Sequence, residues 1–103
     1  MPNVRSEQTD KVDFFGKTTP LELVKTYGTP LYVYNENVLR RRCRDLLGLS
    51  SLPGFHVNYS AKANTNPALL RIIREEGCHA DAMSPGELYI NKLAGFTSRD
   101  LVY

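Results

Sequence analysis

The sequence predicts an α/β fold with parallel strands, and three observations support this prediction. From Phe55 onward, short strand patterns alternate with single helices in the order strand, helix, strand, helix, strand. Each of these helices begins with a capping residue followed by proline and ends at glycine. The strands begin near residues 55, 79 and 101, a little over twenty residues apart. This spacing is typical of parallel strands joined by right-handed crossover helices.

The first of these strands is predicted over residues 55–62, where apolar and polar side chains alternate strictly. One face is apolar, and the other carries His56, Asn58, Ser60 and Lys62. In a doubly wound sheet, helices cover both faces of a strand, so both faces are usually apolar. The polar face therefore favours a (β/α)₈ barrel, in which one strand face points to the interior. The helix and strand periodicity by itself fits either fold.

The two helices of this region carry clear start and stop signals. Asn66 and Pro67 predict the start of a helix that ends at Gly77, and a short strand follows over residues 79–83. Ser84 and Glu87 form an S-x-x-E pattern that predicts a capping box at the next helix, which ends at Gly95. A last strand is predicted from Leu101.

The preceding residues predict two helices and a strand. A helix is expected to start at Thr19-Pro20 and to stop at Gly28, and a β-rich run follows over residues 31–34. Asn35 is expected to cap a third helix, with one buried face made of Leu39, Cys43, Leu46 and Leu47. We therefore divide the chain into an N-terminal extension (1–28), a lead-in strand and helix (29–54), and the first strand-helix units of a barrel (55–103).

Composition and charge exclude several classes of protein. The chain has 42% hydrophobic and 23% charged residues, which is ordinary for a globular domain. No apolar run reaches the length of a membrane helix, and the first ten residues lack a secretory signal, so we expect a cytoplasmic protein without membrane contact. Cys43 and Cys78 are expected to be reduced, partly buried thiols. They share no metal-ligand spacing with His56 or His79, so no metal site is predicted.

Four arginines lie close together in the third predicted helix, at positions 40, 41, 42 and 44. Such a cluster is compatible with an RNA or phosphate contact, which would be sensitive to salt. A solvated helix face is the simpler interpretation, because the net charge of the chain is only +2. We expect no nucleic-acid partner.

Lys62 stands at the carboxyl end of the first predicted barrel strand, the end at which barrels build their active sites. Its neighbours are small or polar, and no acidic residue lies within four positions. An amine in a walled pocket loses its proton more easily and attacks carbonyl groups. The alternative is an ordinary lysine that reaches into solvent at the end of a strand.

Three segments resemble the diaminopimelate decarboxylase family. The run Tyr59 to Leu70 resembles the family's cofactor-lysine motif, and the run Ala80 to Leu88 resembles the motif that follows it. The lead-in over residues 29–34 is similar to the family's opening strand. The three segments agree with the family in order and spacing, over about residues 29–103. This agreement implies the N-terminal part of an alanine racemase-like barrel that binds pyridoxal 5'-phosphate, incomplete in this chain.

The resemblance also implies a site and a reaction. Lys62 would hold pyridoxal 5'-phosphate covalently, and the cofactor would accept the electrons left when carbon dioxide departs. Asp81 and Glu87 match acids near the cofactor, although the capping box already accounts for Glu87. Asn64 belongs to the motif, where turn chemistry is its alternative role, and Ser60 would line the pocket. The substrate would be meso-diaminopimelate and the product L-lysine.

Several related protein families remain possible from the sequence alone. Ornithine and carboxynorspermidine decarboxylases share the lysine-bearing strand, and a non-catalytic pyridoxal phosphate carrier is a further alternative. Alanine racemase has a similar start but departs from the run Asn66 to Leu69. The family's phosphate-binding glycines and the acid facing its pyridine nitrogen would lie beyond position 103. We therefore expect this chain to be an inactive fragment of an enzyme that forms a homodimer.

Overall fold

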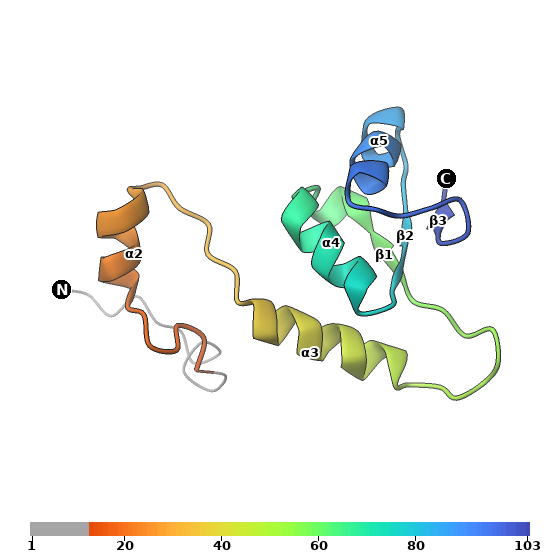
Figure 1. The fold of residues 1–103 in the computed structure, drawn as a ribbon, viewed down its shortest axis with the longest axis horizontal. Helices are drawn as coiled ribbons and strands as arrows, with labels where there is room; N and C mark the ends of the chain where they lie inside the picture. Colours follow the sequence, from red (N-terminus) through yellow and green to blue (C-terminus); the bar gives the residue numbers. More distant parts are fainter. Residues whose placement is uncertain (1–12) are drawn as a thin grey trace. The chain divides into compact units, whose positions relative to one another are not determined.

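The computed structural model describes residues 13–103, which form two compact units (Figure 1). One unit ends at Val38 and the other starts at Leu39. The expectations for the first twelve residues, that they open an N-terminal extension and lack a secretory signal, lie outside the described residues. The division at residues 28 and 54 stays a prediction.

The first helix of the described chain, α2 (Pro20–Tyr27), starts and ends as predicted. The Thr19 hydroxyl accepts a hydrogen bond from the backbone N–H of Glu22 at 3.2 Å, and the Glu22 carboxylate accepts one from the backbone N–H of Thr19 at 2.9 Å. This capping box satisfies backbone donors that the first turn of a helix leaves unpaired. Gly28 then closes the helix with a bond from its N–H to the Val24 carbonyl.

The prediction of a strand over residues 31–34 is wrong. These residues belong to no strand, and all four side chains there, those of Leu31, Tyr32, Val33 and Tyr34, are exposed. A β-rich sequence becomes a strand only when a neighbouring backbone pairs with it, and none of the described strands pairs with this segment. The prediction for Asn35 is confirmed, because its Oδ1 accepts a hydrogen bond from the Val38 N–H at 3.0 Å.

The second unit is built on a three-stranded parallel sheet in the order β1-β2-β3 (Figure 1). Its strands are β1 (Asn58–Ser60), β2 (His79–Asp81) and β3 (Leu101–Val102). Helix α4 (Pro67–Glu75) joins β1 to β2, and helix α5 (Pro85–Leu93) joins β2 to β3. The predicted alternation of parallel strands with single helices is confirmed.

Strand β1 is shorter than the predicted strand over residues 55–62. It ends at Ser60, and a short 3-10 helix, η1 (Ala61–Ala63), follows directly. Its only partner in the described sheet is β2, which is also short, so residues at both ends of the prediction lack a strand beside them. Ala61 is fully buried in η1 and Lys62 is exposed on it. The strand therefore ends two residues before the end that the alternation predicted.

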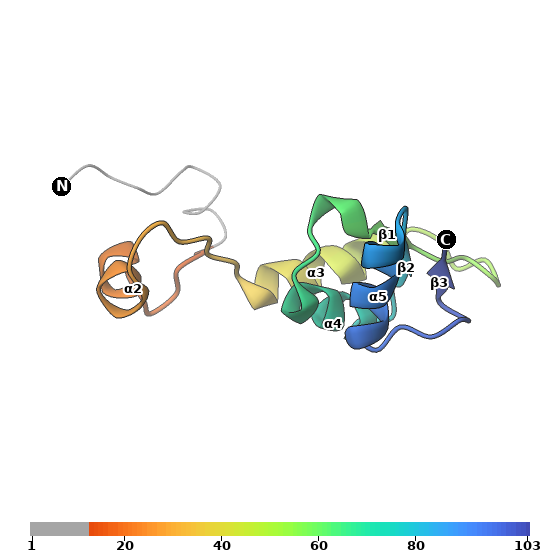
Figure 2. The ribbon, with the colours of Figure 1, turned by 90° about the horizontal axis from the view of Figure 1, so that it is seen from above.

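The two crossover helices begin and end at the predicted residues. Asn66 Oδ1 accepts from the Ala68 N–H at 2.9 Å, and Ser84 Oγ accepts from the Glu87 N–H at 3.1 Å. Gly95 follows α5 with φ +103°, a conformation that side chains other than glycine rarely adopt. The helices contact each other and lie side by side (Figure 2). No helix within residues 13–103 has the length and apolarity needed to cross a bilayer.

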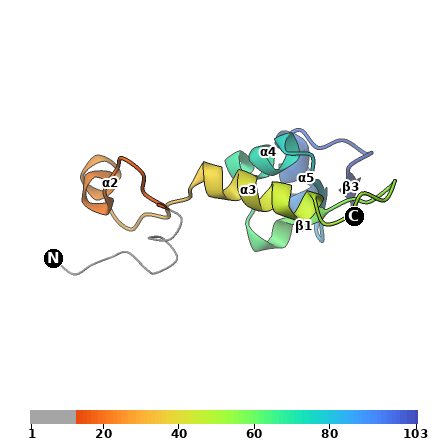
Figure 3. The ribbon, with the colours of Figure 1, turned by 90° about the horizontal axis from the view of Figure 1, so that it is seen from below.

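Helix α3 (Glu36–Leu47) enters the second unit from Leu39 onward (Figure 3). Cys43 is buried, and Leu39 and Leu47 pack against the core, as their spacing predicted. Leu46 was expected on the same face but is 47% exposed. A helix has 3.6 residues per turn, so positions seven apart drift around its axis, and Leu46 lies at the edge of the buried stripe.

The core of the second unit joins α3, α4 and the sheet. Leu70 on α4 is the largest fully buried apolar side chain among the described residues. It belongs to one continuous cluster of buried residues: Cys43, Ala61, Leu70, Ile73, Cys78, Ala80, Ala94 and Phe96. Ala61, in the turn that carries Lys62, is part of this cluster. The position of that turn therefore depends on core packing.

Two of the four clustered arginines form ion pairs with the end of α4. Arg40 donates to Glu75 at 2.8 Å and to Glu76 at 3.0 Å, and Arg44 donates to both carboxylate oxygens of Glu76 at 2.8 and 3.0 Å. Arg42 lies 3.7 Å from Asp45 on the exposed side of α3. Arg40 and Arg44 thus bind acidic side chains of the second unit, so the cluster is only partly the solvated face that was predicted; the expected absence of a nucleic-acid partner stays a prediction.

The contact between α3 and α4 should weaken in acid. Hydrogen bonds from Arg44, and then from Arg40, lower the pKa of Glu76 below its ordinary value of 4.5. A carboxyl group whose pKa is lower in the folded state stabilises that state above pH 4.5, and the contribution is lost as the pH falls through the folded pKa. We expect the unfolding free energies of wild type and Glu76→Gln, measured in urea, to differ at pH 7 and to converge as the pH falls below 4.5.

Asp45→Asn is the matched control for this experiment. The Asp45 carboxylate lies 3.7 Å from the Arg42 guanidinium, farther than Glu76 lies from its arginines, and both side chains of the pair are exposed, so the pair should contribute little to stability. A stability difference for Glu76→Gln that is the same at pH 7 and in acid would contradict the prediction.

Candidate functional site

Parallel strands bring the predicted site residues to one edge of the sheet. Ser60 on β1 is the register partner of Asp81 on β2, and each is the last residue of its strand. Lys62 follows Ser60 by two residues, on η1. The carboxyl ends of parallel strands meet at the same edge, so Ser60, Lys62 and Asp81 share the carboxyl edge of this sheet.

Lys62 is held at this edge by its backbone. The η1 turn is closed by a hydrogen bond from the Asn64 N–H to the Ala61 carbonyl at 3.1 Å, and the buried Ala61 anchors the turn in the core. Lys62 itself is exposed, so its amine is accessible to a molecule at the edge of the sheet. The strand that was predicted to carry Lys62 ends before it, but the predicted edge is correct.

Asp81 has an unmet hydrogen-bonding capacity. Its side chain is half-buried, and its Oδ1 atom is buried without a hydrogen-bond partner among the described residues. A buried acceptor without a donor costs about 1–3 kcal/mol. A ligand that brings a donor or a positive charge to this edge would remove that cost. The role of Asp81 as a site residue stays a prediction.

Asn64 and Glu87 are engaged in local structure. Asn64 Oδ1 accepts from the Asn66 N–H at 2.9 Å, in the turn before α4. Glu87 accepts from the Ser84 hydroxyl at 3.0 Å and from the Met83 N–H at 3.4 Å. The Glu87 carboxylate therefore fixes the turn between Asp81 and α5, which makes it a positioning residue for this edge. A cofactor contact of Asn64 or Glu87 stays a prediction.

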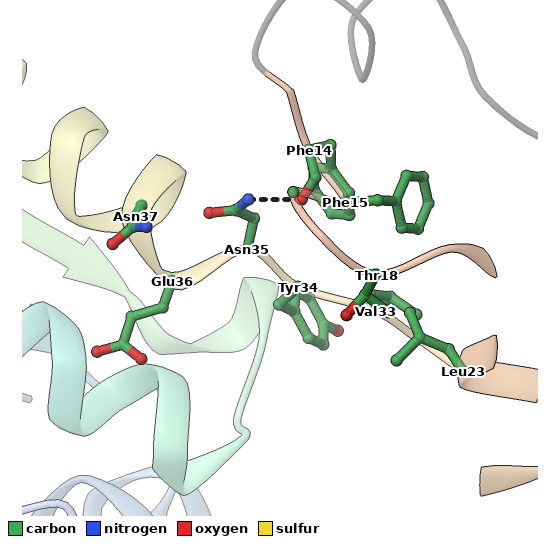
Figure 4. A pocket seen from close by; sticks show the side chains of 10 residues that line it. Phe14, Phe15, Thr18, Leu23, Val33, Tyr34, Asn35, Glu36 and Asn37 are labelled. Carbon is green, nitrogen blue, oxygen red and sulfur yellow. Dashed lines mark hydrogen bonds between the residues drawn. The ribbon is translucent and has the colours of Figure 1, made fainter. Parts of the chain in front are cut away.

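A pocket in the first unit contains none of the predicted site residues. It has a volume of about 400 Å³ and lies between the turn at Phe14 and the extended segment at Val33 and Tyr34 (Figure 4). The Asn35 amide donates to the Phe14 carbonyl at 2.6 Å across it, and the rings of Phe14 and Phe15 meet edge to face. The pocket is therefore explained by the way the turn packs on the extended segment, and no functional role is needed to account for it.

The second unit has a largely apolar pocket of about 330 Å³ between α3 and β1. Val57, Tyr59 and Ser60 line it on the side of β1, and Cys43 and Cys78 lie at its base in the core. The sequence did not predict that the two cysteines meet, because they are far apart along the chain. Within the described residues no group of three metal-ligating side chains is present. The rings of His56 and His79 stack on each other with centroids 4.1 Å apart.

Comparison with known proteins identifies the class to which this lysine-bearing sheet belongs. Residues 37–103 match the family model described as "Pyridoxal-dependent decarboxylase, pyridoxal binding domain". The match covers all three strands, η1 and helices α4 and α5. The lysine-bearing sheet thus lies in a pyridoxal-binding domain.

Individual relatives agree with the family match. The chain is similar to the diaminopimelate decarboxylase of Methanothermobacter thermautotrophicus, with 44% identity over 90 residues, which is 85% of this chain and 21% of the relative. It is 42% identical over 82 residues to the enzyme of Aquifex aeolicus, covering 80% of this chain and 19% of the relative. It is 37% identical over 83 residues to the enzyme of Bacillus subtilis, covering 79% of this chain and 19% of the relative.

The chain belongs to the pyridoxal-binding domain family of the pyridoxal-dependent decarboxylases. It spans about a fifth of the length of the curated relatives it matches. Its cofactor is pyridoxal 5'-phosphate, and the carboxyl edge of the sheet fits that group. Lys62 provides an accessible amine that can bind an aldehyde covalently, and the buried Oδ1 of Asp81 provides an acceptor that lacks a donor.

Proposed function

We propose that this chain is the N-terminal, lysine-bearing part of a diaminopimelate decarboxylase, which converts meso-diaminopimelate to L-lysine and carbon dioxide. The observation that carries the proposal is the carboxyl edge of the sheet, where Lys62 and the unpaired Oδ1 of Asp81 lie at the ends of neighbouring strands. The relatives that match most of this chain are named diaminopimelate decarboxylase, which supports this substrate over ornithine.

Each residue at the carboxyl edge would have its own role in binding the cofactor. Pyridoxal phosphate, when bound, supplies a ring that accepts the electron pair left by the departing carboxyl group. Lys62 would hold the cofactor through its Nζ atom, and the core-anchored η1 turn would fix where that atom lies. Asp81 would accept a hydrogen bond through Oδ1 and favour positive charge beside Lys62. Glu87 would keep the turn after Asp81 in place, and the Ser60 hydroxyl would line the same edge.

The proposal includes the fold and the assembly of the whole enzyme. The described sheet has free edges at β1 and β3, and a closed (β/α)₈ barrel would pair both of them. An alanine racemase-like barrel is consistent with the polar inner face that the sequence shows at residues 58, 60 and 62. A homodimer is proposed from the same resemblance. The isolated 103-residue chain should have no decarboxylase activity.

A hybrid enzyme tests the proposed reaction. Residues 29–103 replace the matching segment of the Methanothermobacter thermautotrophicus relative, and product formation is followed by mass spectrometry. We expect lysine to form from meso-diaminopimelate at a rate at least a hundredfold above the rate of decarboxylation of ornithine. Absorbance of bound pyridoxal phosphate reports separately whether the hybrid is assembled. An assembled hybrid that prefers ornithine, or that decarboxylates neither amino acid, would refute the proposal.

A further inference from the structure

The two cysteines of the chain meet in the core of the second unit. Cys43 lies in the middle of α3, and Cys78 immediately precedes β2. Both are free thiols with exposed fractions of 6% and 3%, and both belong to the same buried cluster of the core. Two elements that are far apart in the sequence therefore bring both thiols to the lining of one pocket.

This thiol pair is accessible to a small molecule. Cys43 and Cys78 both line the largely apolar pocket between α3 and β1, whose volume is about 330 Å³. Water occupies about 30 Å³ in the liquid, so the pocket admits a molecule of the size of hydrogen peroxide. Leu39, Leu46 and Ile73 make up much of the remaining lining. Polar residues, among them Asn58 and Ser60, also line the pocket, but the two thiols are the lining groups that a peroxide oxidises readily.

We propose that Cys43 and Cys78 form a redox modification site, at which a small hydroperoxide converts the two thiols into a disulfide that ties α3 to the start of β2. The inference does not depend on the decarboxylase activity, because neither cysteine is a cofactor residue and the oxidation needs no bound cofactor; Ser60 is the predicted site residue that also lines this pocket.

The chemistry balances with one molecule of hydrogen peroxide. The Cys43 sulfur attacks one peroxide oxygen, an S–O bond forms as the O–O bond breaks, and the leaving hydroxide takes the thiol proton and departs as water. The Cys78 sulfur then attacks the sulfenic sulfur of Cys43. An S–S bond forms, the S–O bond breaks, and a second water leaves with the Cys78 proton. Two thiols have lost two electrons and two protons, and the peroxide has been reduced to two waters.

The surroundings make this oxidation slow at neutral pH. Burial raises the pKa of Cys43, and burial together with the neighbouring Cys43 raises the pKa of Cys78 to about 12. Charged groups act on the pair from both sides: Glu76 at the end of α4 opposes the thiolates, and Arg40 on α3 favours that of Cys43. Since the thiolate is the nucleophile, the rate of disulfide formation should rise with pH between 7 and 9.

The first experiment identifies the product. The 103-residue chain is treated with hydrogen peroxide, digested and mapped by mass spectrometry. We expect a peptide pair joined through Cys43 and Cys78, lighter by two hydrogen atoms, which dithiothreitol separates again. Cys43→Ser and Cys78→Ser should instead give oxygen adducts on the remaining thiol. Oxygen adducts on both thiols of the wild-type chain, without the joined pair, would overturn the proposal.

A second experiment separates a preformed pair from chance encounters in a loose chain. The equilibrium between dithiol and disulfide is measured in a glutathione redox buffer, once in native buffer and once in denaturing guanidinium chloride. If the fold holds the thiols together, the disulfide should be favoured at least tenfold more in native buffer than in denaturant. An equal or smaller preference in native buffer would overturn the proposal, even if a disulfide can be detected.

Discussion

Lys62→Ala should lower lysine formation by the hybrid enzyme by several orders of magnitude, because the change removes the amine that would hold the cofactor covalently. Lys62→Arg should fail to the same extent. Arginine keeps the positive charge but stays protonated and cannot attack an aldehyde. The arginine variant thus separates a covalent role of the amine from a purely electrostatic role of its charge. Both variants are assayed for lysine by mass spectrometry beside the unmodified hybrid.

Lys92→Ala is the matched control for these variants, since Lys92 is also exposed but lies in the last turn of α5. Its hybrid should keep the activity of the unmodified one. Borohydride reduction of the loaded hybrid, followed by peptide mapping, should place the pyridoxyl group on Lys62. A pyridoxyl group on another lysine, or full activity of Lys62→Ala, would show that the assignment of the site is wrong.

The helix boundaries could be predicted because they depend on local chemistry. Thr19, Asn66 and Ser84 each accept a hydrogen bond from the first turn of the following helix, and those bonds involve residues at most three positions away. The sequence pattern contains all the atoms that such a cap needs. Parallel pairing was predictable for a related reason: a single helix between two strands brings the chain back to the end of the sheet where the first strand began, so the second strand runs parallel to the first.

The strand extents could not be predicted, because they depend on partners. Residues 31–34 have the composition of a strand but no paired neighbour among the described strands, and β1 stops at Ser60 although the alternation continues to Lys62. Alternation reports which residues prefer opposite faces, and it does not report where the neighbouring backbone begins or ends. The turn at η1 changes the local structure of Lys62 but leaves it at the predicted edge.

The site residues, too, could be predicted where local sequence indicates them and could not where they depend on tertiary contacts. The sequence indicated Lys62 and Asp81 through motif resemblance, and the register of β1 and β2 explains why the two lie at one edge. It also predicted a capping box of Ser84 and Glu87; Ser84 caps α5 through its hydroxyl, whereas the Glu87 carboxylate accepts from the Ser84 hydroxyl and the Met83 N–H, and a cofactor contact of Glu87 stays a prediction. The meeting of Cys43 with Cys78 depends on how α3 docks on the core, a tertiary contact for which neither residue carries a local signal.

Leu70→Ala should destabilise the chain by about 3 kcal/mol, because it removes buried methyl groups and leaves a cavity in a core that cannot fully close around it. Leu70 is 0% exposed and shares its cluster with Ala61, which anchors the η1 turn. The variant should therefore loosen the turn that positions Lys62 as well as lower overall stability. Urea unfolding followed by circular dichroism measures the change, and resistance of the native chain to proteolysis gives a second measurement.

Leu52→Ala is the matched control, since the same atoms are removed from a leucine that is 74% exposed in the loop before β1. A substitution at such an exposed position should change the unfolding free energy by less than about 0.5 kcal/mol. The proteolysis pattern should likewise stay that of the wild-type chain. Equal effects of Leu70→Ala and Leu52→Ala in both measurements would mean that α4 does not pack on the sheet through Leu70. In that case the core that holds Lys62 at the carboxyl edge would have to be built from other contacts.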